Sequence, residues 1–353
     1  MPRVHTNAGA TRYPLPAHSI GVPASLTVRI LPPIADAIAR RRPVVALESS
    51  VLAQGLPVPA NRRAAEGMLA AISTRGAVPA ITAVVGGTPT LGLEADELEG
   101  FLRRDGVEKV SARDLPAAMV KGANGATTVA AALALSTLAG VSVFATGGIG
   151  GVHREVSPRP TAWLRDESSD LVELARSSVV VVCAGAKSIL DLPATWERLE
   201  TLGITVVGYR TSELPAFFTA ESGIRLSARA ESAGEIARLF RAQRVLGRPG
   251  ALLVVQRPPP AVALERGEVD RAVARAVERA EADGIRGAAV TPYLLAAVER
   301  ETGGRSLEAN LGLLEANAGL AAEIAASLGA SVEGQAARPA FEPEASAQIR
   351  AHP

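Results

Sequence analysis

The segment Val179-Val180-Val181-Val182-Cys183-Ala184-Gly185-Ala186-Lys187 decides the fold prediction. Its first five residues are apolar without polar alternation, which is typical of a strand buried on both faces of a parallel sheet. Open α/β sheets bind ligands beyond the carboxyl ends of their strands, so Lys187 should face a cleft. Partial loss of water there favours the neutral amine, the form that attacks a carbonyl or an anomeric carbon. A lysine that binds an anion or caps a turn is an equally weighted alternative.

A second apolar run, Pro43 to Leu47, ends directly in Glu48. A carboxyl group at a strand end, partly removed from water, can act as a general acid. The commoner role of such a glutamate is to cap the next helix or to pair with an arginine. Glu48 is therefore a candidate acid whose role depends on its neighbours.

Short apolar runs alternate with amphipathic segments along the whole chain, which predicts an α/β fold with a largely parallel sheet. The expected strands are 44–47, 80–85, 109–110, 141–146, 179–183, 204–209 and 251–256. The expected helices are 61–74, 94–104, 126–138, 171–176, 194–202 and 233–243, followed by three closing helices.

The 353 residues are 48% hydrophobic but only 3% aromatic, so the core should consist mainly of Ala, Val and Leu. Residues 1–30 and 331–353 lack periodicity and are rich in small residues, which predicts disordered extensions around one domain, 31–330. No internal linker calls for a second domain.

The charge is balanced, with 37 basic and 36 acidic residues interspersed, so polymeric nucleic acid is not an expected partner. The single cysteine, Cys183, excludes an intrachain disulfide and fits a cytoplasmic protein. No secretory signal is expected. The uncharged stretch 122–152 is broken by glycines and should form a helix and a strand, so no membrane span is predicted.

Two glycine-rich segments could approach an anion. In Gly122 to Val129 small residues lead into a helix, whose free N–H groups could meet a phosphate while Lys109 supplies charge. The segment Gly147 to Arg154 follows a strand, but His153 stands where a dinucleotide fingerprint requires glycine. A nicotinamide enzyme is therefore disfavoured, and the residues before Lys187 also lack the spacing of a nucleoside-triphosphate loop.

The cluster Asp166-Glu167-Ser168-Ser169-Asp170 precedes a predicted helix. Its simpler interpretation is an N-terminal cap, because Ser and Asp satisfy free helix donors. Its functional interpretation is a site for a hard divalent cation held by one or two carboxylates and water.

These segments occur in the order and spacing of one family and together, over residues 34 to 329, resemble pseudouridine-5'-phosphate glycosidases, which include the indigoidine synthase A-like proteins. The matching segments are 45–49, 109–115, 125–129, 143–154, 183–192 and 214–218.

The resemblance implies a three-layer α/β/α fold with a central, largely parallel but mixed sheet, assembled as a homotrimer. It implies a lyase-class enzyme of nucleotide catabolism that reversibly cleaves pseudouridine 5'-phosphate to uracil and ribose 5-phosphate, with Mn²⁺ as cofactor. The catalytic residues implied are Glu48 as proton donor and Lys187 as covalent nucleophile. Substrate contacts are implied for Lys109, Val129, Ser168, Ser169 and Asp170, with His153 and Asn310 placed near the base. Asp166 would hold the metal.

The chemistry explains these residue types. Pseudouridine joins C1' to carbon, so the leaving oxygen that ordinary glycosidases protonate is absent. The hypothesis is that Glu48 protonates the ring oxygen while Lys187 attacks C1', and the resulting imine accepts the electrons as uracil leaves. The chain departs from the family's pattern in a longer segment, 155–165, before Asp166. The alternatives are a related C-nucleoside or sugar-phosphate lyase, and a non-catalytic sugar-phosphate-binding protein.

Overall fold

The computed structural model describes residues 28–154, 166–285 and 290–330. Most of both predicted extensions, and the segment 155–165, lie outside these ranges. Residues Arg29 and Ile30, which were assigned to the amino-terminal extension, instead form the short edge strand β1.

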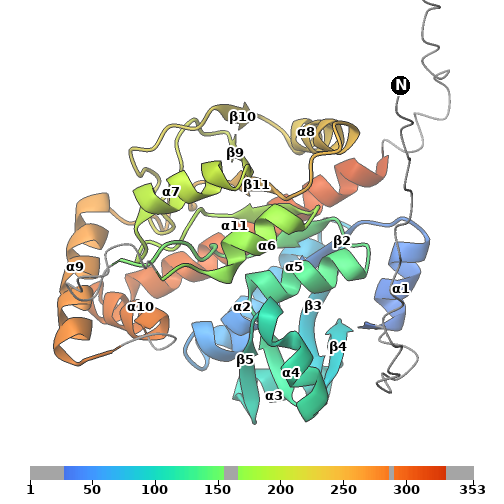
Figure 1. Ribbon diagram of the computed structural model, residues 1–353, viewed down its shortest axis with the longest axis horizontal. Helices are drawn as coiled ribbons and strands as arrows, with labels where there is room; N and C mark the ends of the chain where they lie inside the picture. Colours follow the sequence, from blue (N-terminus) through green and yellow to red (C-terminus); the bar gives the residue numbers. More distant parts are fainter. Residues whose placement is uncertain (1–27, 155–165, 286–289, 331–353) are drawn as a thin grey trace, which may run out of the picture.

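Eleven strands form one sheet with helices on both faces, which confirms the α/β/α prediction (Figure 1). The central strands run in the order β3-β2-β7-β8-β11-β9-β10, and all their pairings are parallel. Their bounds are Val78–Val85 (β3), Val44–Leu47 (β2), Val143–Ala145 (β7), Val180–Cys183 (β8), Leu252–Val255 (β11), Thr205–Tyr209 (β9) and Ala228–Ala230 (β10).

The sheet is mixed because β4 (Thr88–Leu91) and β6 (Asn124–Thr127) run antiparallel to β3, and β5 (Val107–Val110) continues beside β6. The β3–β4 turn uses Gly86 and Gly87, both with positive φ. A Cβ at Gly87 would lie 2.6 Å from the carbonyl oxygen of Met119, so no larger residue fits this turn.

Two layers of helices cover the sheet. In Figure 1, α5 (Val129–Leu138), α6 (Ser169–Arg176) and α7 (Leu192–Thr201) lie in front of it, and α11 (Arg305–Ala330) runs behind. Helix α11 packs on α2 (Ala60–Ser73), on α8 (Ala233–Val245) and on strands β2, β7 and β8. The remaining helices are α1 (Pro32–Ala39), α3 (Ala95–Arg103), α4 (Leu115–Lys121), α9 (Arg266–Ala282) and α10 (Val290–Glu301), with a π-helical turn at Val51–Gly55 and a 3₁₀ turn at Ala112–Asp114.

The prediction of a helix over 126–138 is wrong at its start. Residues 124–127 form β6, and the helix begins only at Val129. Gly125 is a poor helix residue, and a Cβ there would lie 2.6 Å from Val110. Strand pairing on both sides of β6 therefore outweighs the helix propensity of the alanines that follow.

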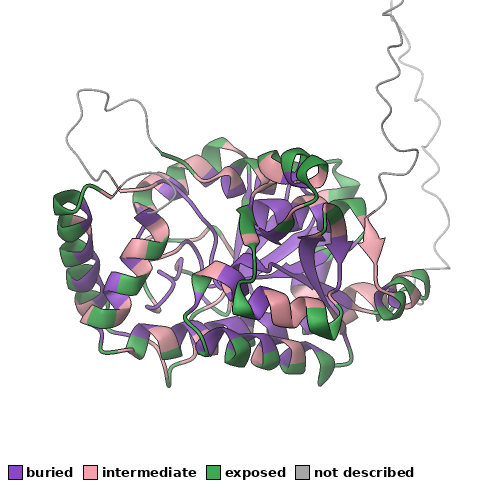
Figure 2. Cartoon of the chain, turned by 90° about the horizontal axis from the view of Figure 1, so that it is seen from below, coloured by how far each residue is buried: buried purple, intermediate pink, exposed green. Residues whose placement is uncertain are grey.

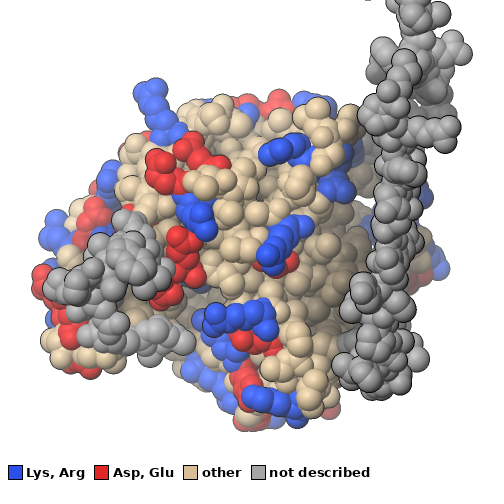
Figure 3. All heavy atoms as spheres, in the orientation of Figure 1, with Lys and Arg blue, Asp and Glu red and all other residues tan. Residues whose placement is uncertain are grey.

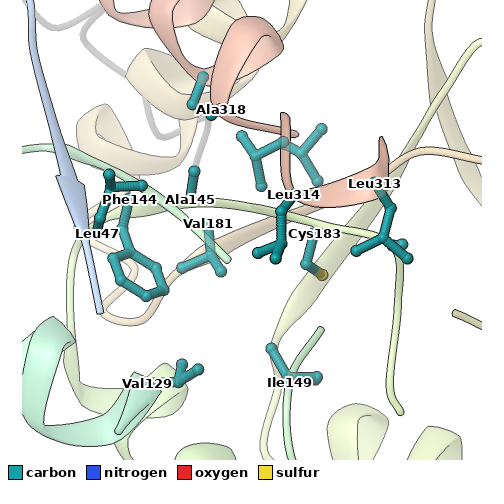
Figure 4. Close-up of a cluster of buried hydrophobic side chains, with 14 of the residues drawn as sticks. Leu47, Val129, Phe144, Ala145, Ile149, Val181, Cys183, Leu313, Leu314 and Ala318 are labelled. Carbon is teal, nitrogen blue, oxygen red and sulfur yellow. The ribbon is translucent and has the colours of Figure 1, made fainter. Parts of the chain in front are cut away.

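The core is aliphatic, as the composition predicted. All four residues of β2, β8 and β11 are buried, and Figure 2 shows the buried sheet between helices that are exposed on their outer faces. Phe144 lies at the centre between Leu47 and Val181 (Figure 4). On the face in Figure 3, basic and acidic side chains are interspersed, in keeping with the balanced charge.

Helix α11 is, within the described ranges, the helix long and apolar enough to span a membrane by composition. In its most apolar window, 56% of the residues are buried inside the molecule, against α2 and the sheet. This burial is that of a core helix.

Candidate active site

Three adjacent parallel strands deliver polar side chains to one edge of the sheet. Leu47 of β2 is in register with Ala145 of β7, and Ala145 with Val182 of β8. Glu48 and Thr146 follow the ends of β2 and β7 directly, so they are neighbours. Since strands in register end at the same edge, the register alone brings the candidate acid toward the lysine that follows β8.

Glu48 and Lys187 line one cavity of about 160 Å³, called here the reaction cavity. Lys109 and Asn310 also line it, so the fold brings four of the sequence-predicted residues together. Lys187 is partly buried, and the cavity wall around it includes Phe217.

Two hydroxyl groups hold the carboxylate of Glu48. Ser50 donates to Oε2 and Thr146 donates to Oε1, each at 2.5 Å. Glu48 is only 5% exposed, so these two donors replace the water that the carboxylate loses on burial. Hydroxyls can also accept, so either one can turn to accept from Glu48 when the carboxyl is protonated. Sequence reasoning missed both residues: Ser50 directly follows the matching segment 45–49, and Thr146 lies inside the segment 143–154.

The segment carrying Lys187 is held by backbone bonds to the glycine loop. The N–H of Lys187 donates to the carbonyl of Ile149 at 3.1 Å, and the N–H of Ile149 donates to the carbonyl of Gly185 at 3.1 Å. Gly148 lies under the ring of Phe217, where a Cβ would come within 2.6 Å. Gly148 and Gly185 thus allow close packing around Lys187. This packing role accounts for glycines that do not follow the spacing of a dinucleotide-binding fingerprint.

Two amide side chains, of which Asn317 is buried, anchor the other side of the glycine loop. Asn317 of α11 donates to the carbonyl of Thr146 at 2.8 Å and accepts from Gln256 at 2.8 Å. The back helix therefore fixes the backbone at the end of β7, and with it the hydroxyl that holds Glu48.

Lys109 comes from the lateral strand β5 and adds a second amine. Lys109 is an exposed residue, but protein atoms around its amine displace part of its water, and this desolvation is the main cause that lowers the pKa of Lys109. The positive charge of Lys187 lowers it further, while Glu48 and Asp170 oppose the shift. The two amines therefore share one electrostatic environment, suited to an anion.

Asp170, a predicted substrate contact, also makes hydrogen bonds to the backbone of two other segments. Its carboxylate accepts from the N–H of Ala130 at 3.0 Å and from the N–H of Gly150 at 2.9 Å. It thereby joins the first turn of α5, which begins at Val129, to the glycine loop. Ser168 caps α6 by accepting from the N–H of Asp170, which confirms the capping interpretation of this cluster.

The hydroxyl groups of Ser169 and Ser111 form a hydrogen bond of 2.7 Å. Ser111 follows directly after β5, the strand that carries Lys109. The first turns of α5 and α6 and the end of β5 are therefore close together. Predicted contacts at Val129, Ser168 and Ser169 would all lie at this corner.

His153 is not part of the lining of the reaction cavity. It lines a separate cavity of about 620 Å³ together with Ser188, whose buried hydroxyl has no partner within the described ranges. Burial is the main cause that lowers the pKa of His153; the charge of Asp166 opposes the shift, and the charges of Lys187 and Lys109 add to it. The structure places His153 within electrostatic reach of the site, and its predicted contact with the base remains a prediction.

The metal prediction rests on few donors. Asp166 is exposed, and its carbonyl accepts from the N–H of His153 at 2.9 Å. Within 28–154, 166–285 and 290–330, no three His, Cys, Asp or Glu side chains are grouped so as to hold a metal ion. The described residues thus fit a cation bound by one carboxylate with water or substrate oxygens, and not a closed protein site.

Residues 33–327 match the family model described as indigoidine synthase A like protein. The chain belongs to this family. It is 60% identical over 293 residues to a protein from Gemmatimonas aurantiaca named pseudouridine-5'-phosphate glycosidase, covering 83% of this chain and 94% of that one. It is 47% identical over 300 residues to the protein of that name from Escherichia coli, covering 84% and 94%.

Two solved structures share the fold. One, with a TM-score of 0.79 and 38% identity, is the prealnumycin C-glycosynthase in complex with ribulose 5-phosphate, matched over 87% of this chain and 99% of that chain. The other, with a TM-score of 0.75 and 34% identity, is an indigoidine synthase A-like protein from Thermotoga maritima, matched over 86% and 97%.

Proposed function

We propose that this protein is a pseudouridine-5'-phosphate glycosidase, which reversibly cleaves the C–C glycosidic bond of pseudouridine 5'-phosphate to uracil and ribose 5-phosphate. The observation that carries the proposal is the convergence of Glu48 and Lys187 on one cavity. Relatives with this name at 60% and 47% identity support it.

The reaction proceeds by ring opening on Lys187. Its neutral amine bonds to C1' while Glu48 gives a proton to the ring oxygen, so the C1'–O4' bond breaks. The bonded nitrogen returns a proton to the Glu48 carboxylate, which passes it to C5 of uracil, and the nitrogen lone pair forms an imine as the C1'–C5 bond breaks. Water adds to the imine, which releases ribose 5-phosphate and restores the amine.

The phosphate would lie between Lys109 and the first turns of α5 and α6. A helix N-terminus offers free N–H groups and the positive end of its dipole to an anion. Ala130 already donates to Asp170, so on α5 the N–H of Val129 is the donor for the phosphate. Binding energy at this end orients C1' over Lys187.

Borohydride trapping tests the imine directly. Wild-type protein incubated with ribose 5-phosphate and borohydride should gain one reduced sugar phosphate on Lys187, detected by peptide mass spectrometry. Lys187→Ala should gain none and should lose pseudouridine 5'-phosphate cleavage. Near-normal turnover by Lys187→Ala would refute the mechanism.

A second function has a specific observation in its favour, since a solved relative is a C-glycosynthase bound to ribulose 5-phosphate. The same imine could join a pentose phosphate to another carbon nucleophile. A panel of C-nucleoside phosphates and aromatic acceptors separates the two functions, because each predicts a different preferred substrate. A protein that only binds sugar phosphates would leave every substrate unchanged.

Mn²⁺ belongs to this proposal, with Asp166 as its protein ligand and charge neutralisation at the sugar phosphate as its contribution. Cleavage should fall after chelation and return with Mn²⁺, and Asp166→Asn should require more Mn²⁺. Unchanged activity after chelation would remove the metal from the scheme.

The remaining parts of the proposal are a homotrimeric assembly and a cytoplasmic location. Light scattering after gel filtration should give three times the mass of the chain. A monomer mass at all concentrations would refute the trimer.

A further inference from the structure

A second cavity, of about 210 Å³, adjoins the reaction cavity and is called here the side cavity. The two share one wall, formed by Gln54, Gly55, Pro292, Leu295 and Asn310. Beyond this wall the side cavity is lined by residues that follow the π-helical turn, by α10 and by the start of α11, with Arg104 and Phe218: Leu56, Pro57, Ala296, Glu299, Ser306 and Leu307. Its described lining contains none of Glu48, Lys109 and Lys187.

The shared wall contains two buried acceptors without hydrogen bonds. Gln54 Oε1 and Asn310 Oδ1 have no partner within the described residues, although the amide nitrogen of Gln54 donates to the carbonyl of Val107 at 3.2 Å. An unpaired buried acceptor is unfavourable, so two of them on one cavity wall fit a ligand that supplies the donors. The ligand for this wall is a planar compound with N–H groups and little charge, as the uracil ring is.

The order of the proposed chemistry favours a separate path for the base. Once the C1'–C5 bond has broken, the sugar phosphate is still bonded to Lys187 and held at the Lys109 end. Uracil that stays beside the imine can add back to it, so release of uracil favours the step in which water completes the reaction. A route that does not pass the bound sugar would let uracil leave, or enter in synthesis, while the adduct stays in place.

We propose that the side cavity is the passage for uracil, and that Gln54 receives one of its N–H groups at the shared wall, next to Asn310, whose contact with the base the resemblance already implies. This inference rests on the proposed function. The sugar phosphate and the base thus use different routes, and synthesis is ordered, with ribose 5-phosphate first and uracil second.

Ala296 of α10 suits a test, because it is exposed and lines the side cavity but not the reaction cavity. Ala296→Trp should obstruct the passage and leave the lysine site unchanged. Ala274→Trp is the matched control, since Ala274 is also exposed in a helix but lines neither cavity. Ala296→Leu replaces the tryptophan variant if that variant does not fold.

The measurement is synthesis of pseudouridine 5'-phosphate with each substrate varied in turn. Ala296→Trp should raise the KM for uracil about fivefold or more, with the KM for ribose 5-phosphate and the borohydride-trapped adduct unchanged. Ala274→Trp should match wild type. An unchanged KM for uracil in Ala296→Trp, or an equal rise in both KM values, would refute the proposed passage. The proposed function would still be supported by the activity of the wild-type protein. A wild-type protein that joins no uracil would overturn both.

Discussion

The hydroxyl of Thr146 is the single group whose removal should most directly disturb Glu48. Thr146→Val keeps the shape of the side chain but leaves Oε1 of a buried carboxylate without its 2.5 Å donor. The expected result is a fall in kcat of about tenfold, with little change in KM, because the acid is no longer held toward the ring oxygen.

Thr302→Val is the control for this change. Thr302 is also buried and donates to a helix carbonyl, but it lines none of the described cavities. Its kcat should equal that of wild type. Equal losses in both variants would indicate general destabilisation and not positioning of Glu48.

Lys109 should give phosphate binding a characteristic pH dependence. Its pKa is lowered from the ordinary value of 10.5, so the amine loses its proton at a lower pH than a free lysine does. In the proposed function the protonated form binds phosphate, so the KM for ribose 5-phosphate should rise as the pH increases through that lowered pKa. Lys109→Arg keeps its charge and should not show this alkaline rise.

The charge of Lys187 supplies the matched test. Since this charge is one cause of the lowered pKa, Lys187→Ala should raise the pKa of Lys109. Calorimetry should then show that Lys187→Ala binds ribose 5-phosphate non-covalently up to a higher pH than the double variant Lys187→Ala/Lys109→Ala does. Identical pH profiles for the single and double variants would exclude Lys109 from phosphate binding.

Among the elements, the junction of α5 with the glycine loop depends on one carboxylate. Asp170→Asn replaces one acceptor oxygen by an N–H₂ group, which faces a backbone N–H of Ala130 or Gly150. The free energy of unfolding should fall by about 1–3 kcal/mol, measured by urea denaturation. Asp270→Asn, at an exposed position of α9, should change it little. An unchanged stability in Asp170→Asn would show that the junction is held by packing alone.

The elements also show where local sequence patterns are sufficient. Strands β2, β8 and β11 are apolar throughout because both of their faces are covered. They could therefore be predicted without knowing which strands they pair with. Strand β6 was missed because it is short and glycine-containing, and it exists through its pairing with β3 and β5. Such strands are defined by neighbours that are distant in sequence.

At the scale of the whole molecule, Cys183 reports on global unfolding. It is fully buried at the end of β8, and burial raises the pKa of its thiol to about 12. The thiolate is the reactive form, so at neutral pH the native protein should resist alkylation. Labelling should appear only when the sheet opens, with the same urea midpoint as the loss of helical circular dichroism.

Rapid labelling of Cys183 in the native state would contradict the buried sheet. A substrate-protection experiment gives the control. Because Cys183 lines neither the reaction cavity nor the side cavity, ribose 5-phosphate should slow labelling only as far as it raises the urea midpoint.

The local sequence was enough to place Glu48 and Lys187 at strand ends and to predict the layered fold, because hydrophobic burial imposes a periodicity that neighbouring residues reveal. It could not show that Ser50 and Thr146 hold Glu48, that Asp170 bonds to two backbone N–H groups, or that Gln54 and Asn310 share a cavity wall. Those contacts depend on strand register and on helix α11 packing across the sheet, which join residues far apart in the chain. Hydrogen bonds act over a few ångströms, so only the folded arrangement decides which polar groups meet.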